Sequence, residues 1–190
     1  MGFRVLQIRH AKVEDSPALA RVQVDSYRTA YAGILPQAYL DHFTYEEQEQ
    51  DWRKLLSAAR SSASATDDIL LVAETQAGEI AGYALGRPGP TGIPPYDSEL
   101  VALHVRQTHQ RLGIGRQLIS AVAGQLQQRG CKALLLWTLA MNPVRTLYEG
   151  LGGQLVGEKE SQLGEDCIAI DVAYGWPDIT KLVLSAYPGR

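Results

Sequence analysis

The residues best suited to chemistry are two glycines and two arginines in the run Gln-Arg-Leu-Gly-Ile-Gly-Arg, residues 110–116. An apolar run at residues 98–105 precedes them, and residues 113–129 continue with helical periodicity. The start of a helix offers unpaired N–H groups and the positive end of the helix dipole, which favour a bound anion. Gly113 and Gly115 let the backbone approach that anion, because no Cβ stands in the way. The segment therefore predicts a phosphate-binding turn between a strand and a helix.

Two other phosphate-binding sequences fit this turn poorly. A P-loop needs a Lys followed by Ser or Thr after its second glycine, and this turn has no such Lys. A dinucleotide fingerprint needs a third glycine where the chain has Leu118. It also needs an acidic residue roughly twenty positions further on, where residues 133–136 are apolar.

A strand followed by Gln-x-x-Gly-x-Gly, here Gln110 to Gly115, resembles the acyl-CoA motif of the GNAT N-acetyltransferase superfamily. Residues 142–153, Asn-Pro-Val-Arg-x-Leu-Tyr-Glu-x-Leu-Gly-Gly, look like the second signature of that family. The resemblance implies an N-acetyltransferase with acetyl-CoA as co-substrate. It would transfer the acetyl group directly to a primary amine of a small molecule or to an exposed peptide amino group.

The same resemblance assigns the cofactor contacts. A bulge in the strand is expected around Leu103, His104 and Val105, where it would expose N–H groups to the thioester and the pantetheine arm. The diphosphate is expected to contact the N–H groups of Arg111, Leu112, Gly113, Ile114, Gly115 and Arg116. Arg111 or Arg116 would add side-chain charge. Asn142 is expected to touch the pantetheine arm, and it is equally suited to cap a helix that takes Pro143 as its first residue.

Acyl transfer to an amine needs an oxyanion donor, a route for the amine proton and an acid for the departing thiolate. By resemblance Tyr148 is the acid, a role that suits a tyrosine because it is protonated at neutral pH; a core aromatic is the alternative. Glu99 is the candidate base, acting through water as in many relatives; a solvated residue at a strand start is the alternative. A period of two places Glu99 on the same face as Leu103 and on the face opposite to His104.

Tyr27 and Tyr31 are the candidate acceptor-binding residues. They lie four residues apart on one helical face, and Tyr-x-Gly-x-Leu-Pro follows at residues 31–36. In relatives this helix, the next one and the loop matching residues 87–97 border the acceptor site. Two aromatics at this spacing are equally compatible with a hydrophobic core.

Periodicity and capping residues predict the elements that position these groups. Strands are expected at residues 5–9, 69–75, 79–86, 98–105, 132–139, 154–159 and 167–174. Helices are expected at residues 16–33, 45–59, 113–129, 142–151 and 178–186. This order predicts an α/β fold of the GNAT type, with a mixed sheet of about seven strands flanked by about four helices. It is expected to be a single domain over residues 1–190 with a short C-terminal extension, 176–190.

The composition of this 190-residue chain limits the classes of partner that it can bind. A net charge of −3 argues against a nucleic-acid partner, which requires a basic surface. The apolar runs are too short to span a membrane, and the four histidines have no metal-ligand spacing. We therefore expect a cytoplasmic enzyme that needs no metal, and the resemblance favours a homodimer. Two alternatives stay open: an acyl-CoA-binding regulatory module without turnover, and a transferase for a longer acyl group.

Overall fold

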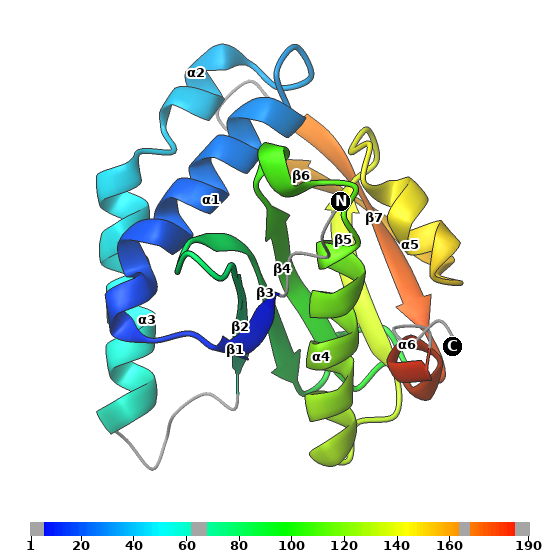
Figure 1. Ribbon diagram of the computed structural model, residues 1–190. Coiled ribbons are helices and arrows are strands. Elements are labelled where there is room, and N and C mark those ends of the chain that lie inside the picture. The colour runs from blue at the N-terminus through cyan, green and yellow to red at the C-terminus, as the bar shows by residue number, and fades with distance from the viewer. Residues whose placement is uncertain (1–5, 62–67, 164–167, 185–190) are drawn as a thin grey trace.

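The computed structural model describes residues 6–61, 68–163 and 168–184. Their strands are β1 (Gln7–His10), β2 (Ile69–Glu74), β3 (Ile80–Pro88), β4 (Ser98–Val105), β5 (Leu134–Leu139), β6 (Gln154–Gln162) and β7 (Ile168–Trp176). Their α-helices are α1 (Ser16–Ala30), α2 (Gln37–Asp41), α3 (Tyr45–Ser61), α4 (Ile114–Gln128), α5 (Arg145–Gly150) and α6 (Thr180–Leu184). Figure 1 shows α1 beside α3 at one side of the sheet, and α4 next to α6.

All seven strands form one mixed sheet in the order β1-β2-β3-β4-β5-β7-β6. The β4–β5 pair is the parallel one, and α4 lies between these two strands in the chain. Its register contains two residue pairs, Ser98 with Leu134 and Glu99 with Leu135. Beyond them the two strands separate, so the middle of the sheet has a gap bounded by unpaired backbone.

Two apolar clusters cover the two faces of the sheet. One joins α4 with the strands through Ile114, Leu118, Val122 and Leu126. The other joins α1 and α3 with the opposite side of β2 and β3 through Leu19, Val22, Trp52 and Tyr83. We call these the α4 face and the α1 face. A ligand in the gap between β4 and β5 is therefore accessible from two differently built sides.

Local sequence signals explain most element boundaries. Thr44 and Glu47 form the predicted capping interaction, in which the Glu47 N–H donates to Thr44 Oγ1 at 3.3 Å. Gly113 directly precedes α4 with a φ of 80°, the left-handed region that glycine adopts without strain. Asp15 precedes α1 but does not cap it with its side chain, since its carboxylate binds Arg9 and the Lys12 N–H instead.

Some boundaries differ from expectation. Helix α2 was not predicted, because a five-residue helix after Pro36 is too short to show a period. Helix α1 ends at Ala30, before the predicted stop at Gly33. Strands β6 and β7 are longer than predicted and extend to Gln162 and Trp176. Predictions for residues 5 and 167, and for the end of the last helix at 185–186, fall on residues outside those described.

Candidate active site

The turn between β4 and α4 leaves a row of N–H groups without internal partners. In the described chain, no hydrogen bond engages the N–H groups of residues 111–116, and the first helical bond runs from Gln117 N to Gly113 O at 3.1 Å. The Gln110 side chain braces the turn, because its Nε2 donates to Val105 O at 3.1 Å. Unpaired N–H groups at a helix start are the donor set that a diphosphate requires. The residues present therefore fit the phosphates of coenzyme A.

The two glycines of the turn have different tasks. Gly113 and Arg111 both have positive φ values, 80° and 61°, and only the glycine adopts this conformation without cost. Gly115 faces the interior, where a Cβ would lie 3.3 Å from Leu147 Cδ2 and 3.8 Å from Leu103 Cδ2. Gly113 thus sets the path of the backbone, while Gly115 lets the start of α4 pack closely on α5 and β4.

A bulge in β4 lies earlier than expected. The register with β3 shifts between Leu85, opposite Ala102, and Gly86, opposite Leu100, so Val101 is the extra residue. The expectation of a bulge at residues 103–105 was wrong, because these residues pair regularly with β3.

The bulge reverses the side-chain alternation of β4. Leu100 and Leu103 both pack on the α4 face although they are three residues apart. Glu99 therefore lies on the α1 face with His104, opposite to Leu103. The strict period of two gave the wrong face for Glu99, since a single extra residue inverts every later position.

Beyond Glu99, the edge of β4 that faces β5 has N–H and C=O groups that point into the gap. Arg106 N–H donates to Ala81 O of β3 at 2.9 Å, and donors alternate along an antiparallel ladder. The N–H of His104 therefore also faces β3, while those of Leu103 and Val105 face the gap. Leu103 and Val105 fit the predicted contact with an extended ligand, and His104 does not fit as a backbone donor.

Asn142 joins helix α1 to the end of β5 across the gap. Its Nδ2 donates to Tyr31 Oη at 2.8 Å and to Thr138 Oγ1 at 2.9 Å, and its Oδ1 accepts the Val144 N–H at 3.0 Å. The predicted cap is thereby present, but it caps the turn before α5, which begins at Arg145. Both amide hydrogens are used internally, so a ligand finds only the second lone pair of Oδ1.

Tyr148 is buried on α5, with its ring against Tyr174 and Trp176. Burial raises the pKa of the Tyr148 hydroxyl above its usual value, and the nearby Tyr31 adds to the rise. The hydroxyl makes no hydrogen bond to any described residue. It is therefore a protonated donor that the described chain leaves unengaged.

An aromatic cluster covers the α1 side of β4. Tyr27 stacks on Phe43 and His104, with centroids 4.7 and 5.5 Å apart, and contacts Tyr31 at 5.2 Å. Tyr83 lies 5.2 Å from His104 on its other side. Burial lowers the pKa of His104 to about 4, so its imidazole is neutral at physiological pH. The two predicted acceptor residues, Tyr27 and Tyr31, are thus brought together, and Tyr31 reaches on to the gap.

Glu99 is half-buried at the start of β4, opposite Arg87 of β3. The guanidinium of Arg87 is held by Asp68, with two contacts of 2.9 Å. Within the described chain no hydrogen bond or ion pair holds the Glu99 carboxylate. It is accordingly available to a water or to a ligand on the α1 face.

Sequence reasoning missed two polar residues of this region, Thr138 and Asp171. Each lies inside an apolar strand, in Leu-Leu-Leu-Trp-Thr-Leu and in Ile-Ala-Ile-Asp-Val-Ala. A polar residue within an apolar run is the signal that would have identified them.

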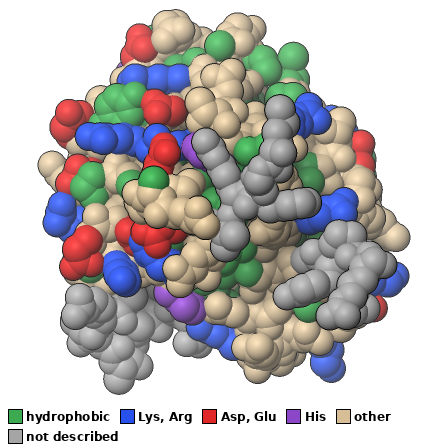
Figure 2. All heavy atoms as spheres, in the orientation of Figure 1, with side chains coloured by type: hydrophobic (Ala, Val, Ile, Leu, Met, Phe, Trp, Pro, Cys, Tyr) green, Lys and Arg blue, Asp and Glu red, His purple; other side chains and the backbone are tan. Residues whose placement is uncertain are grey.

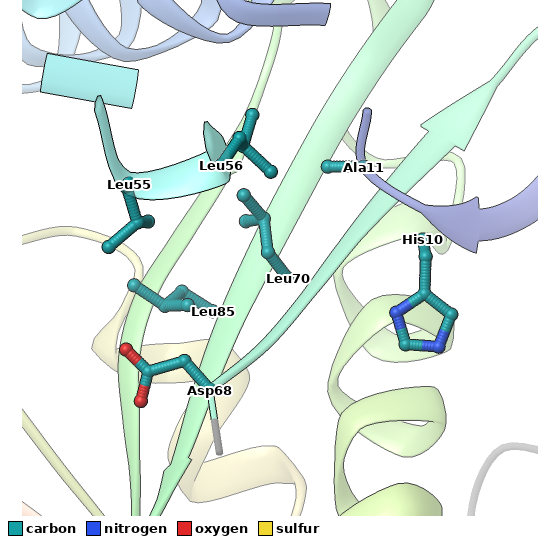
Figure 3. Close-up of a pocket in the computed structure, with 7 residues that line it drawn as sticks. All are labelled: His10, Ala11, Leu55, Leu56, Asp68, Leu70 and Leu85. Carbon is teal, nitrogen blue, oxygen red and sulfur yellow. The ribbon is translucent and has the colours of Figure 1, made fainter. Parts of the chain in front are cut away.

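Two cavities lie outside this arrangement. One, of about 110 Å³, is lined by apolar side chains together with His10 and Asp68, and Figure 3 shows leucines of α3, β2 and β3 converging on it. None of the predicted site residues lines it. The other, of about 310 Å³, lies between α1 and the segment before the turn. Its lining is Asp25, Ser26, Arg28, Thr29, Arg106, Gln107, Thr108 and Gln110.

The described part of the chain contains no group of three or more His, Cys, Asp or Glu residues placed to hold a metal ion. Its helices are each too short or too polar to cross a bilayer. On the side seen in Figure 2, acidic and basic side chains are mixed over the left half of the view.

This chain is similar in sequence to known acetyltransferases. The sequence profile of the acetyltransferase (GNAT) family matches residues 25–152. YuaI of Bacillus subtilis (strain 168), an uncharacterized N-acetyltransferase, is 32% identical over 178 residues, which are 94% of this chain and 96% of YuaI.

Solved structures share the fold at low identity. The paiA N-acetyltransferase of Thermoplasma acidophilum, in complex with coenzyme A, has a TM-score of 0.69 at 18% identity, over 88% of this chain and 98% of its own. The yncA protein of Salmonella typhimurium, solved with its cofactor acetyl-CoA, has a TM-score of 0.63 at 16% identity, over 90% and 92% of the two chains. Both therefore share the fold of this chain.

Proposed function

This chain belongs to the GNAT acetyltransferase family and is an acyltransferase, and from that premise we propose that it transfers the acetyl group of acetyl-CoA directly to a primary amine. The acceptor is a small molecule or an exposed peptide amino group. The observation that carries the proposal is the row of unpartnered N–H groups at residues 111–116, next to a gap in the sheet lined by unpaired backbone.

Acetyl-CoA supplies an activated acyl group with a thiolate as leaving group. The N–H groups of residues 111–116 would hold its diphosphate, with charge from Arg111 and Arg116. The N–H groups of Leu103 and Val105 would hold the pantetheine arm along β4 and so place the thioester in the gap. The backbone near the Val101 bulge is then the candidate oxyanion donor.

Proton transfers fall to side chains on opposite faces of the gap. Tyr148 lies on the α4 face and is protonated at neutral pH, as tyrosines ordinarily are, and burial raises its pKa further. It would donate that proton to the leaving sulfur. On the α1 face, Glu99 would accept the proton of the amine through water. His104 lies on the same face and stays uncharged, so it does not repel a cationic acceptor.

A thiol-release assay with a panel of amines tests the proposal. We expect steady release of CoA thiol from acetyl-CoA with at least one primary amine, and none without an amine. Coenzyme A binding with no turnover across the panel would indicate a regulatory module instead. Faster release of CoA thiol from a longer acyl-CoA with the same amine would show that the preferred acyl group is longer than acetyl.

A further inference from the structure

Asp171 of β7 lies beside the aromatic cluster of the α1 face. Its cross-strand partner on β5 is Leu139, and opposite residues of an antiparallel pair point to one face with Cβ atoms about 5 Å apart. Leu139 packs in the cluster that contains Tyr27 and Tyr31. The Asp171 side chain therefore borders the same space as the two predicted acceptor residues.

The Asp171 carboxylate is not neutralised by a cation of the described chain. The Ser161 hydroxyl donates to one of its oxygens, and no ion pair includes it. Lys159 lies directly opposite on β6, but its ammonium sits 4.1 Å from the centroid of the Trp137 ring. One carboxylate oxygen thus stays available to a ligand.

The surroundings of Asp171 favour a cation. Burial raises the pKa of Tyr27 and Tyr31, and the negative charge of Asp171 contributes to both shifts. His104, which stacks on Tyr27, is neutral and adds no positive charge. Aromatic rings next to a carboxylate form a suitable environment for an ammonium group.

The amine that reacts cannot be the group held by Asp171 during attack. A carboxylate in contact stabilises the protonated form of an amine, and only the neutral form is a nucleophile. A second amine that stays charged gains from the same contact without any cost to the reaction.

We propose that Asp171 binds a second cationic group of the acceptor, so that the preferred acceptors are diamines or other amines with an additional positive charge. This inference rests on the proposed function and narrows its substrate class. Asp171 would act as a binding residue for the acceptor, remote from the bond that is made.

A matched pair of acceptors, 1,4-diaminobutane and butylamine, tests the inference. With the wild-type protein we expect kcat/KM to be about tenfold higher or more for the diamine, the size of one charge-assisted hydrogen bond. Asp171→Asn should bring the diamine down to the level of butylamine through KM. It should leave kcat, the KM for acetyl-CoA and the rate with butylamine unchanged.

Two control variants separate recognition from structure. Ser161→Ala removes the cross-strand hydrogen bond but keeps the carboxylate, so it should retain the preference for the diamine. Glu160→Gln removes a neighbouring exposed charge and should do the same. Equal use of both amines by the wild type, an equal loss for both in Asp171→Asn, or the same loss in Ser161→Ala would overturn the inference.

A binding measurement keeps the inference testable if neither amine is acetylated, an outcome that would count against the proposed function only. Calorimetric titration of 1,4-diaminobutane into the protein saturated with coenzyme A should show binding to the wild type, weakened about tenfold by Asp171→Asn. Equal affinities, or no binding to the wild type, would contradict a cation site at Asp171.

Discussion

The side chain of Tyr148 is the candidate acid for a leaving thiolate because it is protonated at neutral pH. Burial raises its pKa, so it keeps its proton even as the pH passes the usual tyrosine value near 10, although the same rise makes it a weaker acid. Its oxygen has no partner in the described chain, so donation to a ligand breaks no existing hydrogen bond.

We predict that Tyr148→Phe lowers kcat about a hundredfold, a typical loss for a general acid, and leaves the Kd of coenzyme A unchanged. Steady-state rates from pH 6 to 10 and calorimetric titration check this. The control is Tyr96→Phe, which removes the hydroxyl of a tyrosine packed against Gly175. If Tyr148→Phe turns over at the wild-type rate across this pH range, Tyr148 is not the acid.

His104 links the same region to the pH dependence of stability. Its pKa is about 4 in the folded chain and about 6.5 when unfolded. Between these values the unfolded state binds more protons, so stability falls as the pH decreases through this window. At pH 5 the loss from this group is about 2 kcal/mol relative to pH 7.

We predict that His104→Gln removes this loss. Urea unfolding at pH 7 and pH 5 should give a smaller difference between the two pH values for the variant than for the wild type. His42→Gln, on the exposed surface, serves as the control and should behave like the wild type. A difference that His104→Gln leaves unchanged would show that His104 is not the group responsible.

At the scale of elements, the turn before α4 depends on the backbone of one glycine. An alanine at Gly113, where φ is 80°, costs about 1–2 kcal/mol. The turn can relieve this strain only by moving the N–H groups at residues 111–116. If the turn holds the diphosphate as proposed, binding of coenzyme A is coupled to the local fold at this residue.

We predict that Gly113→Ala weakens binding of coenzyme A about tenfold, the factor that corresponds to 1.4 kcal/mol. The control is Gly124→Ala on the same helix, where a Cβ has nothing within 4 Å and φ is not positive. Calorimetric titration compares the two. Equal affinities would mean that the turn does not hold the diphosphate.

Local patterns predicted the elements well, because each strand and helix near the site carries its own signal. Residues 98–105 and 113–129 were recognisable from apolar runs, periodicity and glycine positions, and β4 and α4 agree within a residue. The sheet order and its mixed character agree with the resemblance to the GNAT fold, which is now shown.

Features that depend on pairing between distant strands were not predictable in this way. The Val101 bulge is a property of β4 against β3, and it changed the face assigned to Glu99. The bond between Tyr31 and Asn142 spans 111 residues. The role proposed for Asp171 depends on the pairing of β7 with β5, which brings Asp171 opposite Leu139. Sequence patterns report local periods, whereas these features arise from tertiary packing.

At the scale of the whole molecule, apolar side chains are exposed on the outer strands. Ile168 and Leu155 are 61% and 59% exposed, and Ile170 is 37% exposed. Alternation along β7 puts both isoleucines on the α4 face with Val172, and Leu155 is opposite Tyr174 on the same face. Ile168 and Ile170 lie next to each other on this face, and Leu155 lies about 20 Å from Ile168 along the ladder, since its partner Tyr174 is six residues further on. Exposed apolar residues on one face of a sheet are typical of an interface.

We predict that the chain forms a homodimer that buries this face of β6 and β7, since association removes its exposed apolar side chains from water. Light scattering after gel filtration should give the mass of a dimer for the wild type and of a monomer for Leu155→Lys/Ile168→Lys, because burying two lysines without partners is costly. Leu112→Lys, at another exposed leucine, should remain dimeric. A monomeric wild type contradicts the prediction. If the double variant remains a dimer, the interface lies elsewhere on the molecule.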